Sequence, residues 1–299
     1  MSWAIEVENL KKYYGKVKAV DGISFKVEWG ELFALLGPNG AGKSTTIRVL
    51  TTLAIPTSGI VKVSGYDVIK DEKEVRKRIG LVSDRLILYD RLTVLENILF
   101  FASFYDIDKK EAIRRARNIL EMLEMWDWKD ARVSSLSTGM KQKVNIARAL
   151  VPEPEIIFLD EPTLGLDPLT TRRIREFIKD LNKMGKTIIL TTHVLHEVEI
   201  LADRVAIMNK GKIAALDTTR NLKRYFKEKE IVEIEYEGYF DLNGYRVIEE
   251  SRGYAKIEVE DLQEFLEGLA RQRLKILSIK TFEPSLEDIF VKIAGGEEG

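Results

Sequence analysis

Gly37-Pro-Asn-Gly-Ala-Gly-Lys-Ser44 is the stretch of this sequence that decides the fold. It fits the pattern G-x-x-x-x-G-K-[ST], and it lies between an apolar run at residues 31–36, which predicts a buried strand, and residues 43–50, which predict the start of a helix. Glycines let successive backbone N–H groups turn toward one point, and a helix N-terminus adds a partial positive charge. The stretch therefore predicts a loop that binds the phosphates of a nucleotide.

The last side chains of the loop complete this predicted site. The ammonium group of Lys43 can bridge the two outermost phosphates, and the hydroxyl of Ser44 can be a ligand of Mg²⁺. The alternative is a glycine-rich turn without a ligand, and chance produces the pattern in roughly one chain of this length in a hundred. By itself the loop does not distinguish a transporter ATPase from a kinase or a GTPase. The residues expected to contact nucleotide here are Gly37, Pro38, Asn39, Gly40, Ala41, Gly42, Lys43, Ser44 and Thr45.

The composition narrows the classes of protein. A length of 299 residues leaves room for about two domains. The 47 Lys and Arg residues balance the 48 Asp and Glu residues, which favours no nucleic-acid partner. Cysteine is absent, so disulfides and Cys-ligated zinc or iron–sulfur sites are excluded. Apolar stretches such as residues 93–104 are too short to span a membrane, and early acids argue against a secretory signal, so we expect a soluble polypeptide.

Residues 1–220 are predicted to form one domain. Short apolar runs alternate with amphipathic helical stretches there, which is typical of an α/β fold with a largely parallel sheet. The continuous apolar runs at 156–159 and 187–190 indicate strands buried on both faces. Helices are predicted at 71–79 and 111–125, the second within a helical subdomain at about 85–150.

Residues 221–299 are predicted to form a second, small α+β domain. After Asn221 acids outnumber bases, and the pattern changes to half-buried strands. The last residues, 295–299, are expected to be a frayed tail. The predicted elements are strands at 231–236, 245–248, 254–259 and 274–279, with helices at 261–269 and 286–293.

Two acids, Asp160 and Glu161, follow the apolar run at 156–159. The carboxyl end of a parallel strand is where an open α/β sheet binds its ligands. Asp160 would hold Mg²⁺, directly or through water, and Glu161 would orient and polarise the attacking water as general base. The alternative is a solvated acidic turn, which the phosphate loop earlier in the chain makes the weaker interpretation.

His193 ends another buried run, and it is therefore expected at the same edge of the sheet as the two acids. An imidazole there can donate a hydrogen bond to the transferring phosphate and hold the geometry of the water. The second histidine, His196, lies three positions further in a helical stretch and is predicted to be structural.

Residues 136–140, Leu-Ser-Thr-Gly-Met, precede a predicted amphipathic helix. Ser137 is predicted to be its N-cap. Two interpretations stay open: a plain cap, or a second anion site formed by the Ser137 hydroxyl and the bare backbone of Gly139. The residues on one face of this helix are Met140, Val144, Ala147 and Val151.

Over residues 1–216 these features resemble the nucleotide-binding subunits of ATP-binding cassette (ABC) transporters. Besides the loop at 37–44 and the acids Asp160 and Glu161, the resemblance rests on the signature at 136–140, on Glu-Pro-Thr-Leu-Gly-Leu-Asp at 161–167 and on His193. Kinases and GTPases have no counterpart of the signature or of the Gly-Leu-Asp turn. The resemblance implies the P-loop NTPase fold of ABC ATPases, hydrolysis of ATP, and ATP with Mg²⁺ as ligands.

The resemblance also implies a head-to-tail dimer, formed with a second copy or with a similar ATPase subunit. Asp167 would then lie in the turn that crosses the interface. Tyr14 matches the aromatic residue that stacks on adenine in this family, and Tyr13 is the competing choice, because an aromatic near a strand end can also serve packing. The residues expected to cover ATP bound to the other subunit are Ser137, Thr138, Gly139 and Met140.

The sequence departs from the family at two positions. Residues 79–84 align with a loop that usually carries a glutamine reaching Mg²⁺ and contacting the membrane partner, but Asp84 stands there. Its carboxylate could serve the metal, directly or through water, although it is one methylene shorter and charged. Met140 replaces a glutamine, as in exporter-type cassettes with Thr-Gly-Met-Lys-Gln.

The C-terminal stretch at 283–290 resembles the closing helix of ATPase subunits that pair with separately encoded exporter permeases, although it also fits generic helix capping. We therefore expect an ABC-2 type, drug-exporter-like subunit, cytoplasmic and peripheral on the inner face of the cell membrane, docked on a multispanning permease. Residues 84–99 are the expected docking segment, or alternatively core packing. The exposed-looking residues in it are Leu86, Ile87, Leu88 and Tyr89.

Two other functions are alternatives to this one. A soluble cassette ATPase acting on ribosomes or DNA is disfavoured by the single cassette, the neutral charge, the absence of Cys and the lack of a long coiled-coil insertion. A nucleotide-binding regulator without catalysis is disfavoured by Glu161 and His193.

Overall fold

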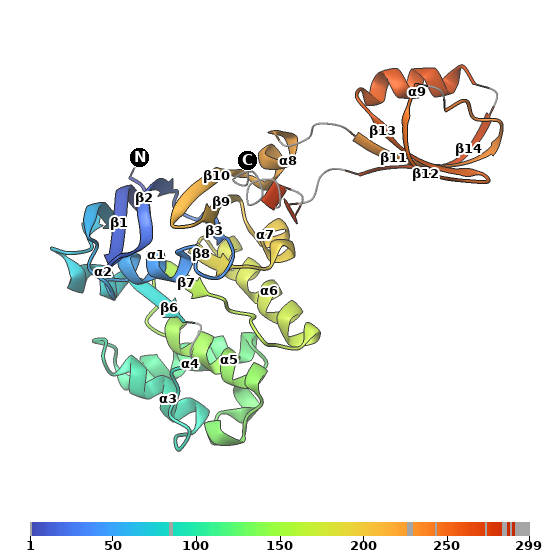
Figure 1. Cartoon of the computed structure of the whole chain (residues 1–299). Coiled ribbons are helices and arrows are strands. Elements are labelled where there is room, and N and C mark those ends of the chain that lie inside the picture. Colours follow the sequence, from blue (N-terminus) through green and yellow to red (C-terminus); the bar gives the residue numbers. More distant parts are fainter. Residues whose placement is uncertain are drawn as a thin grey trace. The chain divides into compact units, whose positions relative to one another are not determined.

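The computed structural model describes residues 2–83, 86–225, 230–242, 244–272, 274–282, 286–287 and 289–290. The chain divides into two compact units, Met1–Thr219 and Arg220–Gly299 (Figure 1). The strands of the first unit are β1 (Ile5–Tyr14), β2 (Val17–Val27), β3 (Leu32–Leu36), β4 (Ser58–Val63), β5 (Tyr66–Asp67), β6 (Ile79–Val82), β7 (Ile156–Asp160), β8 (Thr187–Thr192), β9 (Arg204–Asn209) and β10 (Lys212–Thr218). Its helices are α1 (Lys43–Leu50), α2 (Glu72–Arg78), α3 (Val94–Ala102), α4 (Lys109–Met122), α5 (Thr138–Leu150), α6 (Pro168–Lys183) and α7 (Leu195–Leu201).

The central sheet has the strand order β10-β9-β3-β8-β7-β6. All its neighbours pair in parallel except β10, which is antiparallel to β9. Leu36 pairs with Thr192 and Asp160 pairs with Thr191, so the carboxyl ends of β3, β7 and β8 meet at one edge. The predicted α/β class is confirmed, and with it the edge at which the site residues were expected.

The strands of this sheet are buried on both faces, as their continuous apolar runs predict. Successive side chains of β7 point to opposite faces. Ile157 and Leu159 pack into a core that includes α3 to α6, whereas Ile156 and Phe158 pack into a second core with α1 and the strands near the N-terminus. Because β7 is packed on both faces, its position in the sheet is fixed, and so are the positions of the acids at its carboxyl end.

A second, antiparallel sheet, β2-β1-β4-β5, covers the core on the side of α1. On the other side, α3, α4 and α5 pack together at one end of the first unit (Figure 1). α3 begins with a capping box in which Thr93 and Glu96 satisfy each other's backbone N–H groups. α5 packs against the central sheet through the core that includes Ile157 and Leu159, and the signature residues 136–140 lie at its N-terminus.

Two predicted helix ends were wrong. The helix predicted at 111–125 runs over Lys109–Met122, because Glu124 has a left-handed backbone with φ of 56° that ends it. The helix predicted at 71–79 ends at Arg78. Ile79 instead begins β6, which pairs in parallel with β7 and lengthens the central sheet by one strand.

The second unit holds an antiparallel sheet with the order β12-β13-β11-β14. α9 packs on one face of it through Phe265 and Leu269, which join Val232, Ile234 and Ile257 in a separate core. Among the residues that the structure describes, no helix is long and apolar enough to cross a membrane. The elements of this part of the chain are α8 (Thr219–Tyr225), β11 (Glu230–Gly238), β12 (Arg246–Ser251), β13 (Tyr254–Val259), α9 (Leu262–Ala270) and β14 (Leu274–Phe282).

Candidate active site

The phosphate loop joins β3 to α1 and ends at a helix N-terminus without a side-chain cap. Gly42 is the N-cap residue, and its φ of 106° belongs to the left-handed region. A Cβ at this position would lie 2.5 Å from the backbone oxygen of Ala19, so a side chain cannot be placed here without a shift. α1 has no acid in its first turn. Its first N–H groups are therefore free of side-chain partners and suit an anion.

A pocket of about 580 Å³ opens at this loop, a volume ordinary for a small-ligand site. Loop residues 38–45 line it, together with residues 17–19 of β2, Glu161 and His193. Gly37 does not line the pocket, but its carbonyl accepts a hydrogen bond from Lys43. The structure therefore brings loop residues 38–45 and the three residues expected to be catalytic, Lys43, Glu161 and His193, to one cavity.

Lys43 is buried at the floor of the pocket. Its Nζ donates to the carbonyl oxygens of Gly37, at 2.6 Å, and Pro38, at 3.3 Å. The same Nζ lies 3.5 Å from Oε1 of Glu161. The ammonium group is thus held between the loop and Glu161, which restricts the freedom of the lysine side chain.

Asp160 and Ser44 form a pair of oxygen donors beside the lysine. Asp160 is buried, and its Oδ1 accepts hydrogen bonds from Ser44 Oγ, at 3.1 Å, and from Thr191 Oγ1. Hard divalent cations prefer such oxygen ligands, and Mg²⁺ needs only one or two of them from the protein. No cluster of three His, Cys, Asp or Glu suited to a metal occurs among the described residues.

Glu161 and His193 form a hydrogen-bonded pair at the rim. Glu161 Oε2 lies 2.9 Å from His193 Nδ1, and the imidazole is 41% exposed while the carboxylate is 11% exposed. The backbone of Glu161 has a φ of 50°, rare for a residue with a Cβ, and its N–H donates to the Thr191 carbonyl at 3.0 Å. Such strain persists only where the surroundings over-determine it, and it clusters at active sites.

The two candidate adenine-stacking residues have different surroundings. Tyr13 donates its hydroxyl to Asp21, which raises the pKa of the phenol and lowers that of the carboxyl. Tyr14 is 46% exposed, with Lys12 Nζ 4.7 Å from the centre of its ring. Neither ring lines the pocket described above. Tyr14 is the more exposed of the two, whereas the hydroxyl of Tyr13 is held by Asp21.

The signature segment lies outside this pocket, at the start of α5. Ser137 caps the helix by accepting a hydrogen bond from the Met140 N–H at 3.3 Å, as predicted, and both Ser137 and Thr138 are exposed. A Cβ on Gly139 would lie 2.8 Å from Thr170 Cγ2, so this glycine is also needed for packing against α6 of its own chain. Within one chain the signature therefore does not complete the phosphate site.

Asp167 begins α6, and its carboxylate accepts a hydrogen bond from the Thr170 N–H at 2.9 Å. Hydrogen bonds from Thr170, chiefly from its hydroxyl, lower the pKa of Asp167. His196 is exposed and takes no part in the site, whereas Asp84, the tentative metal ligand, lies outside the described residues.

Sequence reasoning missed the residues that support the site. Thr191 contacts both Asp160 and the backbone of Glu161, and Gln142 of α5 donates to the Pro162 carbonyl at 2.7 Å. Thr191 was visible as the polar end of an otherwise apolar strand. Gln142 had no signal, because its role depends on which loop α5 meets in the fold.

Known proteins of similar sequence match nearly the whole chain. It is 34% identical to the linearmycin resistance ATP-binding protein LnrL of Bacillus subtilis (strain 168), over 97% of this chain and 98% of that protein. It is 36% identical to the bacitracin transport ATP-binding protein BcrA of Bacillus licheniformis, over 99% of each. The chain belongs to the ABC transporter ATP-binding proteins. It is therefore an ATP-binding, ATP-hydrolysing transporter subunit, which confirms the predicted family and activity.

Family matches and solved structures agree with this assignment. The ABC transporter family matches residues 20–164 of the cassette, and the C-terminal domain of DrrA1-3-like ATP-binding proteins matches residues 218–294. A solved dimeric bacterial ABC transporter cassette is similar, with a TM-score of 0.66 and 31% identity over 72% of this chain and 98% of that one. A dimeric post-hydrolysis cassette bound to ADP and Pi has a TM-score of 0.65 and 30% identity over the same shares.

Proposed function

We propose that this cassette is the ATPase subunit of an exporter, which hydrolyses Mg²⁺-bound ATP between two head-to-tail copies. The observation that carries the proposal is the convergence at one pocket of Lys43, Glu161 and His193. The two oxygens of the Glu161 carboxylate face the two nitrogen groups separately, Oε1 toward Lys43 at 3.5 Å and Oε2 toward His193 at 2.9 Å. A base placed between a phosphate-binding ammonium and an imidazole is arranged for attack on a bound terminal phosphate.

The residues of the site would divide the reaction as follows. The first N–H groups of α1 and the Lys43 ammonium bind the β- and γ-phosphates and stabilise the charge that develops on them. Glu161 accepts a proton from the attacking water and orients it. His193 faces Glu161 through Nδ1, so Nε2 is the ring nitrogen left for the phosphate. Ser44 and Asp160 would hold Mg²⁺, which supplies Lewis-acid neutralisation of the phosphate oxygens.

A second copy would complete each site. Ser137 and Thr138 are exposed at the N-terminus of α5, and that N-terminus has no acid in its first turn. An exposed helix N-terminus of this kind can cover a triphosphate bound elsewhere. Ser137, Thr138, Gly139 and Met140 are therefore assigned to ATP on the other copy, and Asp167 to the turn between the two sites. Tyr14 is assigned to the adenine.

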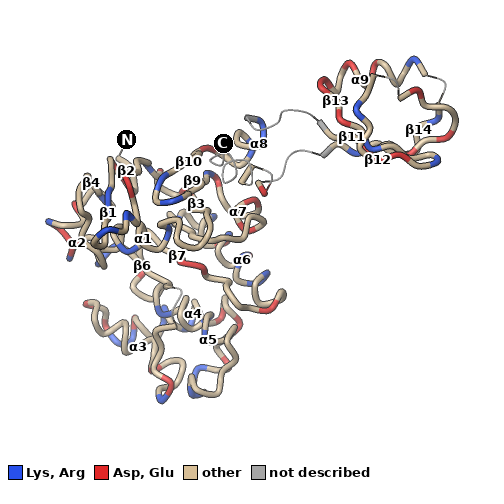
Figure 2. Tube along the Cα trace, viewed as in Figure 1, with Lys and Arg blue, Asp and Glu red and all other residues tan. Residues whose placement is uncertain are grey.

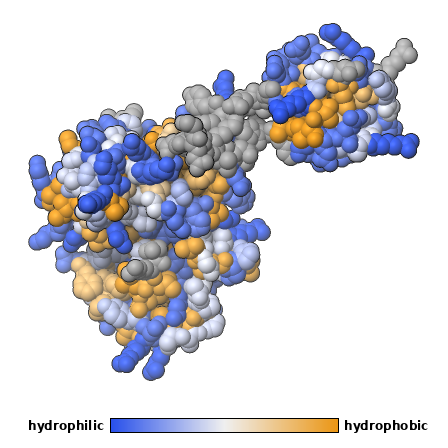
Figure 3. Space-filling model, viewed as in Figure 1, coloured by the Kyte–Doolittle hydropathy of each residue, from blue (hydrophilic) through white to orange (hydrophobic). Residues whose placement is uncertain are grey.

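Docking on a multispanning permease is supported by an apolar surface on the helical part of the cassette. Figure 3 shows hydrophobic side chains gathered where α3 lies in Figure 1. Leu86, Ile87 and Tyr89 of the expected docking segment are exposed, and Phe104 is 70% exposed. Leu88 was also expected to be exposed, but this was wrong, because its side chain packs against the core. Exposed apolar patches of this kind mark interaction sites.

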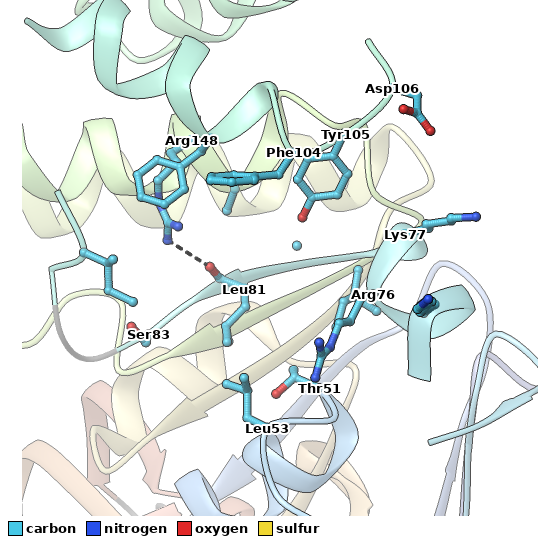
Figure 4. Close-up of a pocket in the computed structure, with 16 residues that line it drawn as sticks. Thr51, Leu53, Arg76, Lys77, Leu81, Ser83, Phe104, Tyr105, Asp106 and Arg148 are labelled. Carbon is cyan, nitrogen blue, oxygen red and sulfur yellow. Dashed lines mark hydrogen bonds between the residues drawn. The ribbon is translucent and has the colours of Figure 1, made fainter. Parts of the chain in front are cut away.

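Beside this surface lies a pocket of about 750 Å³, lined in part by Leu53, Leu81, Phe104, Tyr105 and Arg148 (Figure 4). It lies between β6 and the helices α2, α3 and α5, and its walls are mostly apolar with cationic side chains of α2, Lys73, Arg76 and Lys77, at one side. A short segment of a permease can be placed in it. The relatives named for drug resistance, bacitracin transport and Nod factor export support the direction of transport.

We assign this cassette to the cytoplasmic face of the cell membrane, where ATP is available to a transporter. Figure 2 shows basic and acidic residues interspersed over the described parts of both units, which favours a permease over a nucleic acid as partner. The DNA- or ribosome-directed alternative therefore has no observation in its favour.

The test is Glu161→Gln, which keeps the size of the side chain and removes the base. We expect nucleotide affinity within about twofold of the parent and a loss of hydrolysis of about 10²–10⁴-fold. In the presence of Mg²⁺ and ATP the variant should accumulate as a dimer, measured by light scattering. Glu176→Gln, which removes an exposed carboxylate on α6, is the matched control. Hydrolysis near the parent rate in Glu161→Gln would contradict the assignment of the base.

A further inference from the structure

Glu197, on α7, is a buried carboxylate that the proposed mechanism does not use. It lies four residues after His193 and is 1% exposed. Carboxylates are almost never buried this completely unless they are paired and hydrogen-bonded. Its partners therefore indicate what it holds in place.

The partners of Glu197 come from three different elements. Oε1 accepts a hydrogen bond from the Thr163 hydroxyl, in the loop between β7 and α6. The same oxygen accepts from Arg175 of α6, through Nη2 at 3.1 Å and Nε at 3.2 Å. Oε2 accepts from the Thr192 hydroxyl, at the end of β8, at 2.9 Å. One side chain thus joins the segments that follow two neighbouring strands.

Each of the two threonines is close in sequence to a catalytic residue. Thr163 follows Glu161 by two positions, and Thr192 directly precedes His193. The Thr192 hydroxyl also accepts from the Val194 N–H at 3.0 Å, so the backbone is held on both sides of His193. Glu197 therefore joins the segment that carries the base to the segment that carries the histidine, without touching either residue.

The strained backbone of Glu161 explains why the contacts of Glu197 matter for the active site. Thr191 holds the N–H of Glu161 on the strand side. On the loop side, the Leu164 N–H donates to the Glu161 carbonyl at 3.2 Å, and Gln142 donates to the Pro162 carbonyl at 2.7 Å. Glu197 adds the hydrogen bond from the Thr163 side chain. A residue with φ of 50° tends to relax unless both sides are held. A buried ion pair adds little net stability compared with apolar packing. The consequence of the Glu197 contacts is therefore geometric: they restrain the loop on the far side of the base.

We propose that Glu197 is a positioning residue for ATP hydrolysis, which keeps the carboxylate of Glu161 and the imidazole of His193 at hydrogen-bond distance. The inference rests on the roles assigned to Glu161 and His193 above. Glu197 acts through Thr163 and Thr192, and Arg175 balances its charge. A displacement of the base by about 1 Å is enough to lower the rate by up to about 10²-fold.

The experiment compares Glu197→Gln with Glu176→Gln in the full chain. We expect Glu197→Gln to lower kcat about 10–100-fold while the affinity for ATP, measured by fluorescence titration without turnover, stays within about twofold. Circular dichroism at the assay temperature establishes that the protein is folded. Thr163→Val and Thr192→Val, which remove one hydroxyl each, should lower kcat in the same sense, and combining Thr163→Val with Glu197→Gln should add little further loss.

A purely structural role predicts a different result. Glu197→Gln would then lower the melting temperature, but kcat per folded molecule would match that of Glu176→Gln, and this outcome would overturn the inference. If Glu197→Gln proves unfolded, the two threonine variants decide: parent-like kcat in both contradicts the proposal. Parent-like hydrolysis in Glu161→Gln would instead contradict the proposed function itself, so the two failures are distinguishable.

Discussion

The two sheets that build the cores of the two units use their strand ends differently. In the first unit β3, β7 and β8 run in parallel, and their carboxyl ends meet at the edge where Lys43, Asp160 and His193 lie. In the second unit every pair of strands is antiparallel, so neighbouring strands end on opposite sides. No predicted site residue lies in it. In a parallel sheet the carboxyl ends of neighbouring strands lie at the same edge, so their side chains can form one site. In an antiparallel sheet these ends alternate between two edges.

The charged residues of the two units differ in the same way. In the second unit they pair across neighbouring strands, as Lys275 does with Glu237 at 3.0 Å in an exposed pair and Lys256 does with Glu233 at 3.0 Å in a half-buried one. Exposed pairs of this kind contribute little. In the first unit Lys43 and Glu161 are largely buried and lie in a pocket. The comparison predicts that charge changes matter for activity only in the first unit.

The largest effect is expected for Lys43→Ala. Because this lysine contributes charge at the position of the developing phosphate charge, its loss should lower kcat/KM by about 10²–10³-fold. Lys275→Ala, which removes a lysine from the sheet of the second unit, should change it by less than about twofold. Phosphate release at saturating and limiting ATP measures both. Equal losses of kcat/KM in the two variants would contradict the prediction that charge changes affect activity only in the first unit.

The next effect concerns packing. Ile157 of β7 and Ile257 of β13 are both fully buried, and alanine at either should lower the free energy of unfolding of its own unit by about 2–5 kcal/mol. Calorimetry should show a lower melting temperature for the first unit in Ile157→Ala and for the second unit in Ile257→Ala. Ile257→Ala should retain the parent kcat below its transition. A loss of hydrolysis in Ile257→Ala without unfolding would show that the second unit takes part in the chemistry.

A smaller effect separates two roles of Gly139. Gly139→Ala should lower hydrolysis about tenfold or more, because the new Cβ would lie 2.8 Å from Thr170 Cγ2. Thr170→Ser removes that methyl group. If packing within one chain is the cause, the double variant regains most of the activity. If contact with ATP on the other copy is the cause, the double variant stays as inactive as Gly139→Ala.

The smallest effect is a pH dependence at Asp167. Its pKa lies below its ordinary value of 3.8 in the folded chain, chiefly because the Thr170 hydroxyl hydrogen-bonds to the carboxylate. The stability that it adds is therefore present above about pH 4 and is lost as the pH falls through the folded pKa. Asp167→Ala should melt lower than the parent at pH 7, and the difference should shrink below pH 4. A constant difference would contradict this.

Much of the first unit followed from the sequence for identifiable reasons. The apolar runs at 156–159 and 187–190 have no alternation, so burial on both faces was the natural interpretation, and the polar residues that follow were then expected at one edge. In the second unit the alternation at 254–259 matches the observed strand Tyr254–Val259. Local capping also transferred well, as Ser137 shows.

What sequence could not predict depends on contacts between distant segments. The end of α4 was misplaced because Glu124 takes a backbone conformation that its residue type does not signal. The Glu197 contacts join residues up to 34 positions apart. Leu88 and its neighbours look alike in sequence, and only the fold shows that Leu88 packs inward while Ile87 is exposed.

The most direct test of the account mixes two inactive variants. Lys43→Ala removes the phosphate-binding ammonium, and Thr138→Glu places a negative charge at the exposed start of α5, where it favours the helix but repels a triphosphate. In a mixed head-to-tail dimer one site carries both changes and the other carries neither. The account predicts that an equal mixture regains about a quarter of the parent hydrolysis, because half of the dimers are mixed and each has one intact site. A mixture no more active than its separate components would contradict it.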